Sequence, residues 1–174
     1  MESIINDLWE KKDQLGESEK AAAAKALNTV LQDLGAGRLR VAEKQNGAWI
    51  THQWLKKAIL LSFRLNPSRL MSDGPDGTSW YDKVPMRFEG MSEADFASAG
   101  FRAVPGCFIR ASAYIAPNVV LMPSFVNVGA HVGRGTMVDT WVTIGSCAQV
   151  GENCHISGGV GIGGVLEPLQ ANPV

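Results

Sequence analysis

The spacing of hydrophobic residues changes near residue 100. In the first hundred residues, apolar positions recur every three or four places, as on one face of an α-helix. Beyond about residue 105 that spacing disappears, and branched aliphatics recur every six places. The chain therefore predicts an α+β domain over residues 1–100 and a repetitive β domain over residues 101–174.

Helices dominate the prediction for the first part. Ile5, Leu8 and Trp9 fit a short amphipathic helix, and an alanine-rich helix is expected to follow Ser18. Its apolar face is formed by Ala23, Leu27, Val30, Leu31 and Leu34, with stop signals at Gly35 and Gly37. A further helix, capped by Thr51, has its apolar face at Trp54, Ala58, Leu61 and Leu65.

Turn chemistry marks the remaining boundaries. Asn46-Gly47 lies between two β-prone runs and predicts a hairpin. Residues 72–78 read as a loop. Ser92 and Asp95 resemble a capping box for a short helix that ends near Gly100.

The second part carries a six-residue repeat. Its aliphatics are Val120, Val126, Val132, Val138, Ile144, Val150, Ile156 and Ile162. Small or modest residues occupy the place four further on, at Ser124, Ala130, Thr136, Val142, Ala148, Cys154 and Val160. Glycine directly follows several repeat aliphatics, where we expect it to permit the turn dihedrals, at Gly133, Gly145, Gly151 and Gly163. Ile115 and Leu121 fall one residue out of register, so the first coil is expected to be irregular.

A six-residue period is typical of a parallel β-helix. Each unit makes one short strand and one turn, three units close a triangular coil, and the aliphatic points inward to stack on its counterpart one coil away. A β-sandwich would instead alternate with period two. The spacing alone does not give the handedness of the coil.

Composition narrows the class of protein. Hydrophobic residues make up 45% and charged residues 19% of the chain, which is typical of a globular protein. The net charge of −1 favours neither nucleic acid nor an anionic membrane as a partner. The start of the chain lacks the pattern of a secretory signal, and three cysteines without a CxxC pair suggest reduced thiols in the cytoplasm.

Longer motifs carry a specific resemblance. RVAEKQNGAWITHQWLKKAILLSFRLN, WYDKVPMRFE, GFRAVP, GTMVDTW and SGGVGIGGVLEPLQANP together resemble the tetrahydrodipicolinate N-succinyltransferases over nearly the whole chain. The resemblance implies a left-handed parallel β-helix and a homotrimer with active sites in the grooves between neighbouring β-helices. It also implies transfer of succinyl from succinyl-CoA, as co-substrate, to the amino group of open-chain tetrahydrodipicolinate, with no bound cofactor and no metal.

Two residues are the leading candidates for the site. Asp139 stands at a turn-side position where most units carry glycine, so it could contact an amine or simply hydrogen-bond its own backbone. The match of GTMVDTW to the family favours catalysis and substrate binding by Asp139. Arg102, at the junction of the two parts, would by itself read as a solvated arginine. The resemblance implies that Arg102 binds a substrate carboxylate.

Other readings remain open. A different CoA-dependent hexapeptide acyltransferase would use a histidine base, and His131 and His155 are the candidates, although neither has a neighbouring acid in the sequence. A non-catalytic β-helix scaffold is a further alternative. Its carbonic-anhydrase-like form would need three histidine ligands, and the only other histidine in the chain, His52, lies in the first part. Trp141 is expected to wall a groove or fill a trimer contact.

The resemblance also concerns the length of the chain. Family members continue beyond LEPLQANP with more coils and further active-site residues, so the repeat here is expected to be incomplete. We expect the 174-residue chain alone to have little or no succinyltransferase activity. We also expect it to be less soluble than a full-length enzyme, because an open solenoid end exposes an unpaired strand edge.

Overall fold

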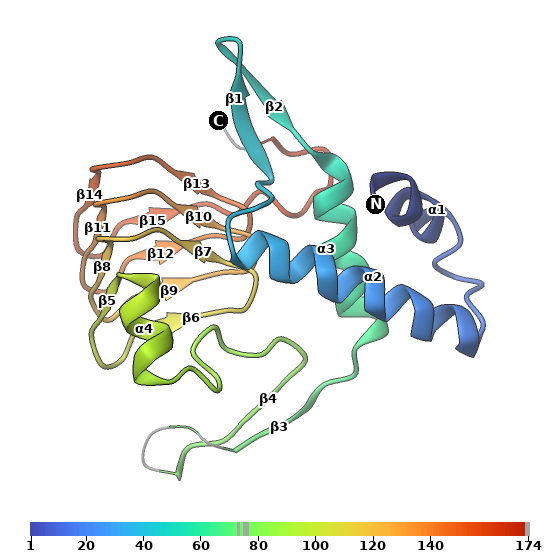
Figure 1. The fold of residues 1–174 in the computed structure, drawn as a ribbon, viewed down its shortest axis with the longest axis horizontal. Helices are drawn as coiled ribbons and strands as arrows, with labels where there is room; N and C mark the ends of the chain where they lie inside the picture. Colours follow the sequence, from blue (N-terminus) through green and yellow to red (C-terminus); the bar gives the residue numbers. More distant parts are fainter. Residues whose placement is uncertain (73, 75–76, 173–174) are drawn as a thin grey trace.

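A computed structural model describes residues 1–72, 74 and 77–172 of the chain. The first three helices form one side of the molecule, and a stack of short strands with the fourth helix beside it forms the other (Figure 1). Part of the loop expected over residues 72–78 lies outside the described residues. In the described part, no helix is both long and apolar enough to cross a membrane.

All four helices lie where the sequence predicts them, whereas only one of their predicted N-terminal caps is present. They are α1 (Glu2–Glu10), α2 (Glu17–Gly35), α3 (Gln53–Leu65) and α4 (Glu93–Ala99). The predicted capping box of α4 is confirmed, because the Ser92 hydroxyl accepts from the Asp95 N–H and the Asp95 carboxylate accepts from the Ser92 N–H. Gly100 ends α4 with a left-handed φ of 70°.

Two predicted helix starts are wrong. α2 begins one residue before Ser18, with Gly16 as its N-cap residue. The Gly16 N–H donates to the Glu19 carboxylate at 2.9 Å, so the side chain of the third helical residue caps this end. Thr51 does not cap α3, because it is the last residue of a strand and His52 takes the capping position without a side-chain bond.

Two hairpins accompany the helices. β1 (Ala42–Gln45) and β2 (Ala48–Thr51) are antiparallel, and left-handed φ angles of 49° at Asn46 and 85° at Gly47 confirm the predicted turn. The second hairpin joins β3 (Arg69–Met71) to β4 (Trp80–Asp82) and was not predicted, because both strands are only three residues long.

The rest of the described chain is the predicted left-handed parallel β-helix (Figure 1). Its two-residue strands form three faces, ordered β13-β10-β7, β14-β11-β8-β5 and β15-β12-β9-β6, and every pairing is parallel. The strands are β5 (Arg102–Ala103), β6 (Phe108–Ile109), β7 (Tyr114–Ile115), β8 (Val120–Leu121), β9 (Phe125–Val126), β10 (His131–Val132), β11 (Met137–Val138), β12 (Thr143–Ile144), β13 (Gln149–Val150), β14 (His155–Ile156) and β15 (Gly161–Ile162).

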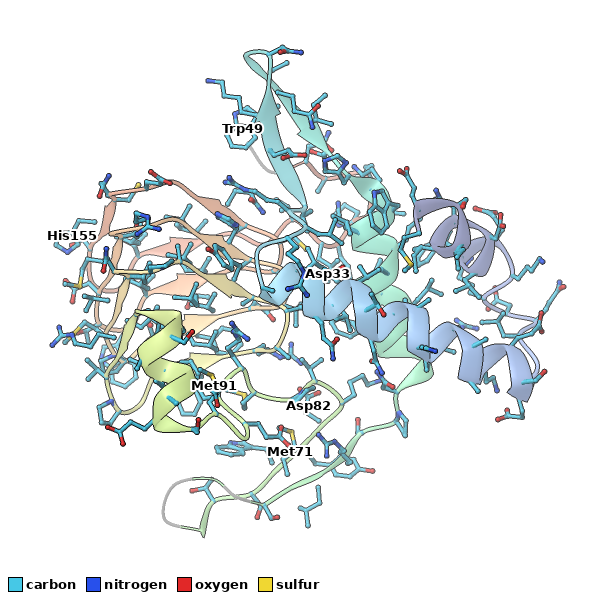
Figure 2. All side chains as sticks on the ribbon, viewed as in Figure 1. Asp33, Trp49, Met71, Asp82, Met91 and His155 are labelled. Carbon is cyan, nitrogen blue, oxygen red and sulfur yellow. The ribbon has the colours of Figure 1, made fainter. Side chains whose placement is uncertain are left out.

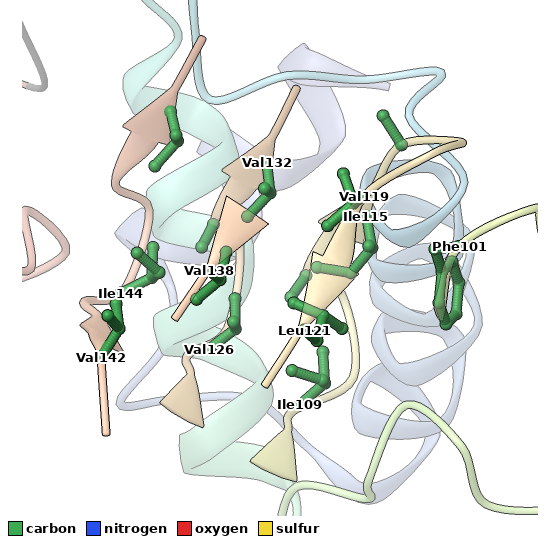
Figure 3. Packing of buried hydrophobic residues seen from close by; sticks show 14 of the residues in the cluster. Phe101, Ile109, Ile115, Val119, Leu121, Val126, Val132, Val138, Val142 and Ile144 are labelled. Atoms are coloured by element: carbon green, nitrogen blue, oxygen red, sulfur yellow. The ribbon is translucent and has the colours of Figure 1, made fainter. Parts of the chain in front are cut away.

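The second residue of each strand points inward, as the repeat predicts from Val126 onward (Figure 3). The start of the predicted register is wrong, because Val138 pairs with Leu121 and not with Val120. Leu121 is fully buried, whereas Val120 is only half-buried and faces outward. The step from Leu121 to Val126 is therefore five residues long.

This one shortened step also explains the apparent irregularity upstream. Ile109, Ile115 and Leu121 keep a spacing of six and are all buried in the same interior cluster. The first coil therefore has the same build as the later ones, and the expected irregularity is confined to a corner that lacks one residue.

The glycines that follow repeat aliphatics have a different purpose from the one predicted. Left-handed φ angles occur two residues further on, at positions such as Gly135 and Trp141, and not at Gly133 or Gly145. A Cβ built on Gly133 would lie only 2.5 Å from the backbone of Gly151, and one on Gly145 would collide with Gly164. Glycine is needed there because successive coils approach closely.

We expect Gly133→Ala to destabilise the fold by about 1–3 kcal/mol, the usual cost of overpacking. Gly163→Ala is the matched control, because a Cβ there meets nothing within 4 Å. Urea unfolding of both variants measures the difference. Equal free energies of unfolding would mean that the coils are not stacked as described.

Helices α1, α2 and α3 pack on one corner of the β-helix. A buried cluster joins residues of these helices, such as Leu27 and Ile59, to Val128 and Cys147 from the β-helix. Because this interface is apolar and buried, the helices cover that corner of the β-helix and leave its opposite faces uncovered. The division into domains at residue 100 stays a prediction.

The segment after β15 returns to α3. The ammonium of Lys56, on a residue with no exposed surface, donates to the carbonyl oxygens of Leu169 and Ala171 at 2.5 Å each. The Gln53 amide donates to Asn172 Oδ1 at 2.8 Å. These bonds anchor the LEPLQAN segment on the side of the molecule that carries the helices.

Candidate active site

The sheet formed by β5, β8, β11 and β14 carries most of the candidate residues, and we call it the Asp139 face. Strand pairing aligns one outward column on it, consisting of Arg102, Val120, Met137 and His155. Asp139 follows Val138, the inward residue of β11, and stands where this face meets the next corner. The face lies away from α2 and α3, and Figure 2 shows His155 at its outer edge.

The Asp139 carboxylate is held by three hydrogen bonds. Oδ1 accepts from the Thr140 N–H at 2.7 Å and from the Thr140 hydroxyl at 3.3 Å, while Oδ2 lies 3.2 Å from His155 Nε2. The Thr140 N–H, followed by the His155 bond, holds the pKa of the Asp139 carboxyl below its ordinary value. The reading that Asp139 bonds the neighbouring backbone is therefore met, whereas its contact with a substrate amine stays a prediction.

Sequence reasoning missed the contact with His155. That histidine lacked an acidic neighbour in the sequence, but it pairs with Met137 one coil below and so lies diagonally beside Asp139. An ionised carboxylate only accepts hydrogen bonds, so His155 presents Nε2–H to it. The 18-residue period of one coil was the signal that could have found this pair.

Arg102 lies on the same face but does not reach Asp139. It belongs to β5, two strands from β11, which corresponds to about 10 Å along the coil axis. Its side chain is exposed and has no hydrogen bond or ion pair with any other described residue. The arrangement leaves room between Arg102 and Asp139 for a molecule that both could contact.

Trp141 stands at the corner next to Asp139. Its side chain is 72% exposed and its φ is 60°, a left-handed conformation that costs a bulky residue of the order of 1 kcal/mol or more. One coil further on, the same corner position is Gly159, where a Cβ would meet nothing within 4 Å. The indole is thus displayed beside the Asp139 face without a cover from its own chain.

His131 occupies a different face and is covered. Its ring packs on Tyr114 with centroids 4.8 Å apart, and its Nδ1 is buried without a hydrogen-bond partner in the described part of the chain. Burial, and then the charge of Arg40, lowers the pKa of His131 to about 4. A histidine covered in this way is poorly placed to take a proton from a substrate.

The low pKa of His131 predicts a pH-dependent stability. In the unfolded chain the imidazole takes up a proton near its ordinary pKa of 6.5, whereas in the folded protein His131 becomes protonated only near its lowered pKa of about 4. The free energy of unfolding should therefore fall as pH decreases from about 6.5 to about 4, by up to about 3 kcal/mol from this group. His131→Gln should make this dependence shallower and His155→Gln should not, as measured by urea unfolding at each pH.

The three histidines do not come together as metal ligands. His52 is paired with Glu43 at 2.8 Å near the start of α3, and His131 and His155 belong to different faces. Across the residues that the structure covers, no group of three or more His, Cys, Asp or Glu side chains could hold a metal ion. The geometry thus offers no support for the carbonic-anhydrase-like reading.

Comparison with known proteins adds the family. A family model described as tetrahydrodipicolinate N-succinyltransferase N-terminal matches residues 1–65. The 2,3,4,5-tetrahydropyridine-2,6-dicarboxylate N-succinyltransferase of Parvibaculum lavamentivorans is 62% identical over 175 residues, which cover 100% of this chain and 62% of the relative. By sequence, the chain is thus similar to tetrahydrodipicolinate N-succinyltransferases over its whole length.

Other enzymes of this name are similar to a comparable degree. The enzymes of the same name from Methylorubrum populi and Paramagnetospirillum magneticum are 60% and 61% identical, again over 100% of the chain. The chain spans about 62% of the length of each of these relatives. The sequence resemblance to the family is confirmed, whereas the roles of Asp139 and Arg102 stay predictions.

Proposed function

We propose that the protein carrying this chain transfers succinyl from succinyl-CoA to the amino group of open-chain tetrahydrodipicolinate, with Asp139 as the catalytic contact to the amine. The observation that carries the proposal is the hydrogen-bonded Asp139 carboxylate on an open β-helix face, beside His155. The names of the relatives supply the succinyl group and the acceptor, and a CoA thioester is proposed as the donor from the family resemblance.

The chemistry follows from the charge of the carboxylate. The amine attacks the thioester carbonyl only when neutral, and the new C–N bond forms as the C–S bond breaks and CoA leaves as a thiolate. A carboxylate with a lowered pKa is a weak base but a strong hydrogen-bond acceptor, so Asp139 orients the amine. The proton released by the amine passes from Asp139 to water or to the departing thiolate, while the His155 Nε2–H keeps its bond to the other carboxylate oxygen.

Arg102 is proposed to bind a carboxylate of the acceptor. A guanidinium forms two parallel hydrogen bonds with a carboxylate, and the acceptor named for the relatives is a dicarboxylate. The spacing of about 10 Å between β5 and β11 lets one small molecule contact Arg102 at one end and Asp139 at the other.

We further propose a homotrimer in the cytoplasm, with each site in a groove between two β-helices. Trp141 supports the groove, because an indole that is 72% exposed beside the site suits a surface that a neighbouring copy covers. The three cysteines are unpaired, which suits a reducing compartment.

A second candidate is a related CoA-dependent acetyltransferase with a histidine base. The observation in its favour is the ion-pair distance of 3.2 Å between His155 and Asp139, because an acid that orients a histidine is the usual arrangement for such a base. In that case His155 would be indispensable and Asp139 would only position it.

CoA release from the intact protein tests the proposal. With tetrahydrodipicolinate as acceptor, we expect turnover with succinyl-CoA and much slower turnover with acetyl-CoA. A preference for acetyl-CoA, together with a larger loss in His155→Asn than in Asp139→Asn, would favour the second candidate and contradict the first.

A further inference from the structure

A cavity of about 460 Å³ lies between the helical layer and the β-helix. It is bounded by the end of α2, the end of α3, the segment 83–87 and the β-helix corner at Ser112 and Val128. None of the candidate active-site residues lines it. Its volume falls in the range of small-molecule binding sites.

Arg87 is the central polar residue of this cavity. Its guanidinium is half-buried and lies against α2, 3.9 Å from the place a Cβ on Gly35 would take. Its Nε is buried without a hydrogen-bond partner, and its side chain has no ion pair with any other residue that the structure describes. A buried N–H without an acceptor is costly, which makes the Nε of Arg87 an unusual feature for a purely structural residue.

The rest of the lining favours an anion. Among the described residues that bound the cavity, none is an aspartate or glutamate, so no carboxylate of the wall competes for Arg87. The amides of Asn28, Gln32 and Asn66 also line the cavity and can donate hydrogen bonds. One guanidinium and three amides in a lining that is otherwise largely apolar are donors that suit an oxyanion.

The helix ends nearby do not cancel this preference. α2 and α3 both end at the cavity, and free carbonyl groups there would repel an anion. At the end of α3, the Phe63 carbonyl already accepts from Lys83 Nζ at 2.7 Å. At the end of α2, the carbonyls of Gln32 and Leu34 accept from the N–H groups of Ala36 and Gly37. These bonds satisfy the carbonyl groups of Phe63, Gln32 and Leu34. The Nε of Arg87, in contrast, has no acceptor in the described part of the chain.

We propose that this cavity is a second binding site of the protein, which takes a small metabolite bearing a carboxylate or phosphate group on Arg87. Because the site joins the helical layer to the β-helix, an occupied cavity should stiffen that junction and raise thermal stability. The proposal does not depend on the succinyltransferase reaction.

Thermal unfolding and titration calorimetry with two probes test the site. Glutarate and inorganic phosphate represent the two oxyanion sources, and sodium chloride at equal ionic strength controls for screening. We expect a saturable rise in melting temperature with at least one probe. Arg87→Met should weaken that association about tenfold or more, as loss of a charged hydrogen-bonding partner does. Arg38→Met is the matched control, because Arg38 is an exposed arginine paired with Asp33 outside the cavity.

Hydrogen exchange on the unmodified protein locates the bound probe and decides the matter if Arg87→Met does not fold. Protection of residues 28–36, 59–66 and 83–87 by glutarate or phosphate would support the proposal. Protection confined to the Asp139 face, no saturable effect of either probe, or unchanged binding in a folded Arg87→Met variant would overturn it.

Discussion

Asp139→Asn in the intact protein should lower the rate of CoA release by about 10²–10⁴-fold, the usual contribution of a group that handles a proton in the transition state. Asparagine keeps an oxygen that can accept the Thr140 N–H, so the corner should remain folded. It loses the negative charge that orients the amine and pairs with His155. The loss should therefore appear mainly in kcat and only weakly in KM.

Two further variants give this result its meaning. His155→Asn should reduce the rate less than Asp139→Asn, because it removes one hydrogen-bond donor to the carboxylate and leaves the charge of Asp139 in place. Glu152→Gln removes an exposed acid from a turn of the same β-helix and should leave the rate within about twofold, as is usual for surface substitutions. An Asp139→Asn rate close to that of the unmodified protein would remove Asp139 from the mechanism.

Leu121→Ala should destabilise the fold by about 2–5 kcal/mol, because Leu121 is fully buried between coils and its loss leaves a cavity. Val120→Ala should cost less than about 1 kcal/mol, because Val120 faces outward and is half-buried. The two positions are adjacent in sequence, so the pair distinguishes the observed register from the one that a continuous six-residue repeat suggests.

Urea unfolding at a fixed protein concentration measures both free energies, since association could change with dilution. A larger cost for Val120→Ala than for Leu121→Ala would restore the register that begins at Val120. Similar costs for both would mean that this coil is not tightly packed.

The six-residue spacing made most of the β-helix predictable. Once Val126 is placed inside, each later aliphatic to Ile162 follows, because strands of successive coils must stack in register. The shortened step between Leu121 and Val126 was not predictable. Val120 and Leu121 are adjacent aliphatic residues, so either could be the inward residue, and the spacing alone favoured Val120. Glycine positions were found, but Gly133 and Gly145 are needed for the close approach between coils, which only the stacked geometry reveals.

The candidate site was predictable in part for the same reason. The one-coil period could have placed His155 beside Asp139, as the pairing of Met137 with His155 shows. Arg87 could not have been found this way, because its cavity depends on how α2 and α3 pack against the β-helix, and no local pattern encodes that packing. The helix start expected after Ser18 and the cap expected at Thr51 were wrong, because Gly16 and His52 take the capping positions of α2 and α3.

Methyl–methyl nuclear Overhauser contacts of Val138 test the coil register that positions Asp139 most directly. The stacked coils predict strong contacts from Val138 to Leu121 on one side and to Ile156 on the other, with none to Val120. Contacts from Val138 to Val120 in place of Leu121, or an absence of contacts to both Leu121 and Ile156, would contradict the fold on which the proposed site depends.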